Sequence, residues 1–325
     1  MKLVSFQLGT PIGPLRRIGA LVGQERVVDL ASAHRLKLLG AGLTESAATR
    51  IGAALLPGDM VDFIEGGERS LAAAREAVDW AAQAEHTIGA GPVHELRDLA
   101  LLAPVPRPPL LRDFMAFETH LKNIYPRLGR DIPPEWYNIP VYYKGNAGSV
   151  GAHGDDIAIP SYADELDFEF ELALVIGTGG ANIPRERALQ HVFGYMIYND
   201  FSARTIQSRE MSVGLGPAKG KDFTRGHVLG PWLVTPDEIA DVYDLRMIAR
   251  VNDEVWCDEN SRTMHWRFED MIAHASRDEE LCPGEVFGSG TVGNGSGAER
   301  GVALKRGDVV ELTVAGIGVL RNRVV

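Results

Sequence analysis

Two glutamates alternate with apolar residues in the segment 167–176. If this segment is a strand, Glu169 and Glu171 lie on one face, with their Cα atoms about 6.6 Å apart. Ala173 and Val175 continue the glutamate face, which predicts that it is partly buried. Buried carboxylates repel one another unless a cation lies between them. The pair therefore indicates a metal site, although the solvated face of an edge strand would also fit, since charged residues are mostly exposed.

Two aspartates stand where an apolar run gives way to a segment with helix-forming character. Asp113 precedes an expected helix at about 114–123. Asp200 lies between the apolar run Val192–Tyr198, an expected buried strand, and an expected helix at about 201–210. Strand-to-helix junctions are places where a fold gathers polar groups, so both aspartates are candidate site residues.

The residues after each aspartate repeat a helical spacing. Asp113 and His120 are seven positions apart, and Asp200, Arg204 and Gln207 stand at i, i+4 and i+7. This spacing puts each set on one helical face. Two ordinary N-caps with surface side chains are the alternative interpretation. Together with the glutamates, the two junctions offer four carboxylates, a histidine, an arginine and a glutamine.

The order and spacing of these motifs closely resemble the fumarylacetoacetate hydrolase family, from about residue 109 to the C-terminus. The motifs are Asp113-x6-His120, Asp167-x-Glu169-x-Glu171, Asn199-Asp200-x3-Arg204-x2-Gln207 and Leu215-x5-Lys221. Gly288–Thr291 fits that family's late loop, and the first hundred residues look like its small N-terminal domain. The resemblance implies small keto acid substrates and a divalent ion held by Asp113, Glu169, Glu171 and Asp200.

The four implied ligands are oxygen donors, which favours a hard ion, Mg²⁺ or else Ca²⁺ or Mn²⁺, over zinc. Four carboxylates around one dication leave an excess charge of about −2, which Lys221 would partly offset if it folds back toward the site. Such an ion acts as a Lewis acid and orients a chelating substrate.

On the family's pattern, His120 is the general base that activates water, and Arg204, Gln207 and Lys221 hold the oxyanion. Tyr143, which could instead be a cross-strand aromatic residue, and Thr291 are the expected substrate-binding residues. A carboxylate orients the histidine in that family. Glu118 and Glu299 are the candidates here, and the sequence places neither.

The implied reaction is hydrolysis of a carbon–carbon bond in a β-diketone acid, such as fumarylacetoacetate or an acylpyruvate, in aromatic compound catabolism. Decarboxylation or tautomerisation of an oxo-diacid, or dehydration of a keto-sugar acid, is the alternative on the same metal site. A catalytically silent metal- and keto-acid-binding protein is a further alternative, against which the intact His120, Arg204, Gln207 and Lys221 speak.

Composition narrows the class of protein. The chain has 325 residues and a net charge of −11, which argues against a nucleic-acid-binding protein. Its two cysteines, Cys257 and Cys282, form no zinc motif or disulfide framework. Neither a long apolar run nor a signal peptide is evident, so we expect no membrane partner and a cytoplasmic location. The family resemblance also predicts a homodimer.

The expected fold class is α+β and β-rich, because strands dominate after residue 110 without regular βαβ alternation. The resemblance implies a mixed β-sandwich roll as the catalytic domain, at 109–325, behind a small α+β N-terminal domain at 1–105. The boundary is placed at the Pro-rich segment 103–109. Residues 31–86 are expected to be helical, most plainly Arg69–Ala84. The other expected strands are 27–30, 141–144, 157–159, 168–176, 232–235, 245–252 and 309–314, and the other expected helices 185–190 and 267–275.

Other candidate motifs carry less weight. Gly288–Gly293 matches G-x-G-x-x-G, but no helix is expected after it, so a flexible loop closing over a ligand is favoured over a dinucleotide site. The segment 153–156 is expected to be a turn. His227 and His265 are interpreted as lone core or surface histidines without a carboxylate partner.

Overall fold

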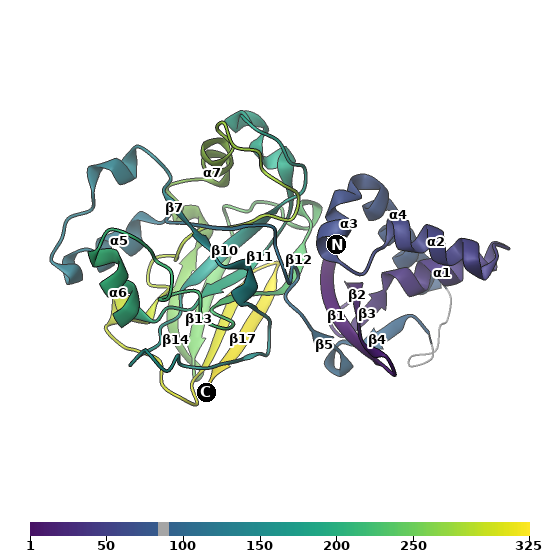
Figure 1. Cartoon of the computed structure of the whole chain (residues 1–325), viewed down its shortest axis with the longest axis horizontal. Coiled ribbons are helices and arrows are strands. Elements are labelled where there is room, and N and C mark those ends of the chain that lie inside the picture. The colour runs from purple at the N-terminus through teal and green to yellow at the C-terminus, as the bar shows by residue number, and fades with distance from the viewer. Residues whose placement is uncertain (84–90) are drawn as a thin grey trace.

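The computed structural model describes residues 1–83 and 91–325 (Figure 1). The N-terminal part is an antiparallel set of strands covered by helices. Its elements are β1 (Lys2–Thr10), β2 (Gly13–Val22), β3 (Arg26–Asp29), α1 (Leu30–Gly40), α2 (Glu45–Leu55), α3 (Met60–Glu65), α4 (Gly67–Gln83), β4 (Val93–Glu95), η1 (Leu96–Asp98) and β5 (Ala100–Leu101). Asp29 is the N-cap of helix α1, and its side chain accepts a hydrogen bond from the Ser32 amide. The last residue of the expected helix Arg69–Ala84 lies outside the described residues.

The rest of the chain is rich in strands. Its elements as far as β12 are β6 (Leu111–Phe114), α5 (Glu118–Ile124), η2 (Pro126–Leu128), η3 (Pro134–Tyr137), β7 (Tyr142–Gly145), η4 (Ala147–Ser149), β8 (Val150–Gly151), β9 (Asp156–Ile157), β10 (Phe170–Ile176), η5 (Arg185–His191), β11 (Val192–Asp200), α6 (Arg204–Ser212) and β12 (His227–Val234). The remaining elements are η6 (Pro236–Glu238), β13 (Arg246–Val251), β14 (Glu254–Asn260), η7 (Ser261–Thr263), α7 (Phe268–Ala275), β15 (Val286–Gly288), α8 (Gly297–Arg300), β16 (Val309–Val314) and β17 (Gly318–Val324).

The strands form two sheets. Twelve strands of the described chain make the larger sheet, in the order β4-β3-β2-β1-β12-β11-β10-β15-β6-β7, with β5 beside β1 and β8 beside β12. The smaller sheet has the order β14-β13-β16-β17-β9. Strand β1 pairs with β12, so the N-terminal strands extend the sheet that carries the C-terminal part. The expected boundary at 105–109 falls between β5 and β6.

Strand β10 is buried on both faces. Leu172 and Leu174 belong to the apolar core that also includes strands of the smaller sheet. Ala173 and Val175 belong to a second core, shared with the N-terminal helices. The α+β, β-rich class expected from the sequence is confirmed. None of the described helices is long and apolar enough to cross a lipid bilayer.

Two helices begin later than the sequence predicts. Asp113 lies on β6 and Asp200 ends β11, whereas α5 begins at Glu118 and α6 at Arg204. The intervening backbone makes tertiary hydrogen bonds instead of helical ones: the Ala116 amide donates to Ser289. Asp113 therefore shares no helix with His120, nor Asp200 with Arg204, and the expectation of common helical faces is wrong. The segment expected as a helix at 185–190 is the 3₁₀ helix η5.

Candidate metal and keto acid site

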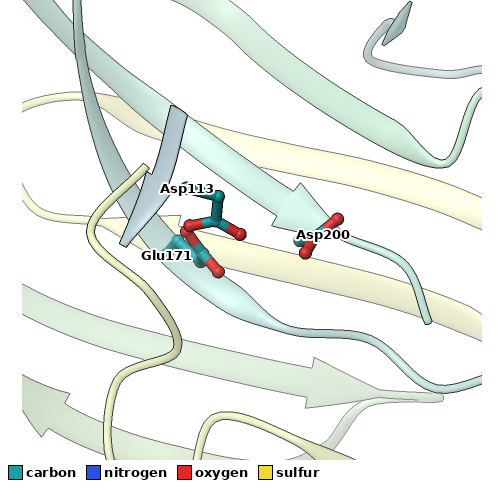
Figure 2. A group of neighbouring side chains, drawn as sticks. All are labelled: Asp113, Glu171 and Asp200. Carbon is teal, nitrogen blue, oxygen red and sulfur yellow. The ribbon is translucent and has the colours of Figure 1, made fainter. Parts of the chain in front are cut away.

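Three buried carboxylates meet on the larger sheet. One oxygen from each of Asp113, Glu171 and Asp200 lies within 4.8 Å of the others (Figure 2). They come from β6, β10 and the end of β11, and all three side chains are buried. Strand β15 lies between β6 and β10, and its Gly288 pairs with Asp113 on one side and Ala173 on the other.

Gly288 leaves the space in which two of these carboxylates meet. A Cβ atom at this residue would lie 2.7 Å from Oδ1 of Asp113 and 2.7 Å from Oε2 of Glu171. Real Cβ contacts are not that short, so any other residue here would have to displace the carboxylates. The backbone at Gly288 therefore leaves the room in which the two carboxylates meet.

The negative charges of the two carboxylates that meet at Gly288 are not neutralised by an ion pair with the described residues. Burial and the charge of Asp200 raise the pKa of Asp113 well above its ordinary value. Burial and the charge of Asp113 do the same to the pKa of Glu171. Oδ1 of Asp113 and Oε1 of Glu171 are buried and accept no hydrogen bond from the described residues. Buried oxygen donors without partners fit a hard divalent cation.

The negative charge of Asp200, in contrast, is offset by neighbouring hydrogen-bond donors. Its Oδ2 lies 2.5 Å from Nζ of Lys221 and accepts a hydrogen bond from the Tyr143 hydroxyl at 2.7 Å. Its Oδ1 lies 3.1 Å from Nδ1 of His227. Burial alone would raise the pKa of Asp200, but Lys221 and His227 outweigh it and hold the pKa far below its ordinary value.

Glu169 is held beside the cluster by two cations. Oε1 lies 2.6 Å from a guanidinium nitrogen of Arg204, and Oε2 lies 2.5 Å from Nζ of Lys221. Burial would raise the pKa of Glu169, but Arg204 and Lys221 lower it. Glu169 and Asp200 share the same ammonium group, but Glu169 is not among the three carboxylates that meet, so its expected role as a fourth metal ligand stays a prediction.

Lys221 is fully buried, and its ammonium group faces acceptors of the protein. These are Glu169, Asp200 and the Ser202 hydroxyl, which lies 2.7 Å from Nζ. Burial would lower the pKa of Lys221, but the two carboxylates raise it. The arrangement holds carboxylates in place, and the expected contact with a substrate oxyanion stays a prediction.

Asp167 fixes the arginine of the site. Its Oδ2 accepts from Nε and Nη2 of Arg204, at 2.9 and 2.7 Å. The same carboxylate accepts from the backbone amides of Gly297 and Ala298, at the start of α8. Arg204 also donates to Oε1 of Gln207 at 3.0 Å, so these residues form one network.

His120 has a carboxylate partner from the far end of the chain. Its Nδ1 lies 3.1 Å from Oε2 of Glu299. Glu299 is set by a capping box, in which it accepts from the Ser296 amide and hydroxyl, and it also accepts from Asn123 at 2.9 Å. Of the two candidates that the sequence left open, Glu118 instead contacts Tyr137 and Lys122.

A cavity of about 590 Å³ lies beside the network of His120, Asp167 and Arg204, and its lining among the described residues does not include the clustered Asp113, Glu171 and Asp200. His120, Asp167, Glu169, Arg204 and Gln207 line it on one side. Its apolar lining includes Met115, Leu121, Ile124, Leu128, Met211 and Val302. Its lining also includes Arg127 and Arg130, neither of which forms an ion pair with the residues that the structure describes.

The two expected substrate-binding residues lie differently. Tyr143 donates to Asp200, beside the carboxylate cluster. Thr291 is buried in the segment after β15 and does not belong to the lining of the cavity within the described chain. The segment 288–293 is buried throughout and its Gly290 amide donates to Glu171, so it packs into the site rather than lying over it as a loop.

Sequence reasoning missed His227. The ring is fully buried, Nδ1 faces Asp200 and the Tyr198 hydroxyl, and Nε2 lies 3.0 Å from Oδ1 of Asp222. Burial would lower the pKa of His227, but its hydrogen bonds with Asp200 and Asp222 raise it to about 9. The expectation of a histidine without a carboxylate partner is wrong. His265 packs against the ring of Trp136, in agreement with a structural role.

Comparison with known proteins shows which family the chain resembles. A family profile described as "Fumarylacetoacetate (FAA) hydrolase C-terminal" matches residues 110–325. The chain is 36% identical over 272 residues to the mitochondrial oxaloacetate tautomerase FAHD2A of Homo sapiens, covering 83% of this chain and 81% of that protein. It is 29% identical over 311 residues to the oxaloacetate tautomerase YisK of Bacillus subtilis, covering 94% and 95%.

A solved structure shares the fold of about two thirds of the chain. It is fumarylpyruvate hydrolase from Pseudomonas aeruginosa in complex with Mn²⁺ and pyruvate, with a TM-score of 0.58 and 26% identity, covering 66% of this chain and 89% of that one. The profile spans most of the chain, and the human relative is similar over most of both sequences. The resemblance read from the sequence is thus confirmed, and the chain belongs to the fumarylacetoacetate hydrolase family.

Proposed function

We propose that this protein is a metal-dependent enzyme that moves a proton at the carbon next to the ketone of a small anionic keto acid. Keto–enol tautomerisation of an oxo-diacid such as oxaloacetate is the first candidate reaction. The observation that carries it is the His120–Glu299 pair, whose histidine lines a cavity that Glu169 and Arg204 also line. Two relatives named as oxaloacetate tautomerases support this choice over hydrolysis.

Asp113, Glu171 and Asp200 would hold the divalent ion, with Glu169 as the fourth carboxylate at hand. Mg²⁺ or Mn²⁺ fits the all-oxygen donor set, and Ca²⁺ is the remaining option. Such an ion would polarise the ketone and lower the cost of removing a neighbouring proton. The fumarylpyruvate hydrolase that binds Mn²⁺ and pyruvate supports a keto acid next to a metal in this fold.

The chain's own residues divide the remaining work. A carboxylate can only accept hydrogen bonds, so Glu299, whose Oε2 lies 3.1 Å from Nδ1 of His120, would keep the ring proton on Nδ1 and leave Nε2 to take the substrate proton and return it. Arg204 and Gln207 line the cavity and would bind the substrate carboxylate. Arg127 and Arg130 add positive charge to the same cavity, which makes a dianionic substrate the best match.

Hydrolysis of a carbon–carbon bond is the second candidate. The same histidine could deprotonate a water molecule, which would then attack the ketone of a fumarylacetoacetate- or acylpyruvate-like substrate in aromatic compound catabolism. The specific observation in its favour is again the histidine held by a carboxylate.

A homodimer and a cytoplasmic location, both expected from the sequence, stay predictions, and light scattering at micromolar concentration tests the first.

One assay separates the candidates. Protein freed of metal with EDTA is returned to Mg²⁺ or Mn²⁺ and offered enol oxaloacetate, whose conversion to the ketone is followed by ultraviolet absorbance. Acylpyruvates, fumarylacetoacetate and 2-oxo-hept-enedioate are offered in parallel. Because metal ions can act on oxaloacetate alone, the Glu171→Gln variant at the same metal concentration is the control. Faster conversion by the wild type supports tautomerisation, and cleavage of an acylpyruvate without such conversion would reverse the order of the candidates.

A further inference from the structure

His227 is a buried ionisable residue of the site to which the proposed chemistry gives no part. It lies on β12 directly opposite Asp200 of β11 in the antiparallel ladder. We propose that His227, itself held by Asp222, is a positioning residue that fixes the carboxylate of Asp200 for the divalent ion. This inference rests on the proposed metal site and assigns a residue of this chain that the motifs of the sequence do not include.

The ring is held on both sides. Nδ1 lies 3.1 Å from Oδ1 of Asp200, and Nε2 lies 3.0 Å from Oδ1 of Asp222. A Cβ atom on Gly145 would lie 3.1 Å from Cε1 and from Nε2 of His227, so the ring packs against the backbone at the end of β7. No part of the ring is exposed. Within this packing the imidazole cannot swing away from Asp200 without moving β7 or β12.

Asp222 is anchored in turn. Its carboxylate accepts a hydrogen bond from the Asn146 amide at 2.9 Å, and its carbonyl oxygen accepts from the Ser149 hydroxyl at 3.1 Å. Both contacts tie it to the connection between β7 and β8. The chain of contacts therefore runs from this connection through Asp222 and His227 to Asp200.

The contact bears on metal binding because of how the oxygens of Asp200 are divided. Oδ2 serves Lys221 and Tyr143, whereas Oδ1 faces His227. Holding both oxygens fixes the rotation of the carboxylate and thus the directions of its lone pairs toward Asp113 and Glu171. Partners that orient metal ligands are worth about 10–100-fold in metal affinity.

A series of substitutions separates positioning from packing. His227→Asn keeps a donor near the position of Nδ1 and the contact with Asp200, His227→Gln places its amide near Nε2 and keeps only the contact with Asp222, and His227→Phe fills the space with neither. Asp222→Asn is a milder change at a partly exposed residue that leaves the ring in place. The control is His34→Phe, because His34 is also buried but lies in α1, in the N-terminal part.

The readouts are the Kd for Mn²⁺, from the electron paramagnetic resonance signal of the free ion, and the rise in Tm that saturating Mn²⁺ causes. We expect His227→Phe and His227→Gln to bind Mn²⁺ about 10–100-fold more weakly, and His227→Asn and His34→Phe to stay close to the wild type. Asp222→Asn should weaken binding less than His227→Phe.

Two results would overturn the inference while leaving the proposed metal site in place. Equal Mn²⁺ affinity in the wild type, His227→Phe, His227→Gln and Asp222→Asn would show that the contact does not affect the ligand. An equal loss in His227→Asn and His227→Phe, with the Tm of the metal-free proteins unchanged, would show that ring volume matters and the contact does not. If the wild type binds no Mn²⁺, the proposed metal site is itself wrong and this inference falls with it.

Discussion

Asp113 and Glu171 lie together only because the residue between them has no side chain. A methyl group on Gly288 would lie 2.7 Å from an oxygen of each carboxylate and 2.8 Å from the Tyr198 ring. We therefore expect Gly288→Ala to displace at least one carboxylate and to weaken Mn²⁺ binding by roughly the 10–100-fold seen when the surroundings of metal ligands are disturbed. Titration with Mn²⁺ measures this effect.

Gly9→Ala is the matched control for this prediction, because a Cβ at Gly9 meets no atom within 4 Å and the backbone there suits alanine. Equal Mn²⁺ affinity of Gly288→Ala and the wild type would show that the ion does not lie between these carboxylates.

His120 and Glu299 act as a unit in the proposed mechanism. His120→Ala should lower kcat by about 10²–10⁴, the usual contribution of a positioned general base. Glu299→Gln should lower kcat as well, because an amide can present its NH2 group to Nδ1 and so favour the wrong tautomer of the histidine. Neither residue belongs to the carboxylate cluster, so the Kd for Mn²⁺ should hardly change. Steady-state kinetics on oxaloacetate and on an acylpyruvate provide the measurement.

Glu118→Gln is the control here, since Glu118 contacts Tyr137 and Lys122 rather than the histidine. Full activity of His120→Ala on both substrates would remove the histidine from the mechanism. Full activity on oxaloacetate with loss only on the acylpyruvate would assign the histidine to water activation.

At the scale of elements, the alternation of residues predicted the two faces of a strand but not where the helices begin. The alternation in 168–176 placed Glu171 on the side of β10 that Ala173 and Val175 continue in the structure, whereas Glu169 lies one residue before the strand begins. The helix starts were wrong, because the amides of residues 116 and 201–203 bond to distant parts of the chain. Such pairings come from tertiary structure and leave no trace in a local window.

The partners of His120 and His227 were also not predictable from the neighbouring sequence. Glu299 had a local signal, since Ser296 and Glu299 form a capping box, but its contact with His120 joins residues far apart in sequence. His227 meets Asp200 through the register of β11 and β12, which no spacing in the sequence specifies. The three carboxylates that meet were all candidates from the sequence, whereas the contacts of His227 with Asp200 and of Glu299 with His120 could not be predicted from it.

Strand β6 also carries a buried arginine next to Asp113 in the sequence. Its Arg112 is buried, and it donates to Glu285 at 3.0 Å and to Glu279 at 2.8 Å. Arg112→Leu would leave the buried Glu285 without its partner, so we expect a loss of about 3–5 kcal/mol in the free energy of unfolding. Arg246→Leu, which removes an exposed ion pair with Asp258, should cost less than about 1 kcal/mol. Urea unfolding compares the two variants.

The contact between Arg112 and Glu279 predicts that the stability of the protein depends on pH. The hydrogen bond from Arg112 lowers the pKa of Glu279 from its ordinary value of 4.5 to about 2. A lowered pKa in the folded state stabilises the protein above the ordinary value, and this stabilisation is lost as the pH falls toward 2. The difference in unfolding free energy between the wild type and Arg112→Leu should therefore shrink between pH 4.5 and pH 2. A constant difference would contradict the assignment of this pair.

At the scale of the whole molecule, the N-terminal part is built into the sheet of the site. Strand β1 pairs with β12, with Leu3 opposite Leu233, and β12 is also the strand that carries His227 (Figure 1). Phe63 of α3 packs edge-on against Phe193 of β11, with ring centroids 6.1 Å apart. One apolar core contains residues from both parts, including Tyr198 beside the site. The two parts thus share backbone hydrogen bonds and a core.

This sharing predicts the outcome of removing residues 1–105. The remaining chain would expose the edge of β12 and the apolar side chains of Phe193 and Leu233, which now face the N-terminal part. An unpaired edge and an exposed apolar face favour aggregation. We expect the truncated chain to aggregate or to unfold at a clearly lower temperature, and to lose Mn²⁺ affinity because β12 no longer holds His227 firmly. Size-exclusion chromatography, thermal unfolding and Mn²⁺ titration measure this, and a soluble truncated chain with the wild-type Tm and Kd would show that the catalytic part stands alone.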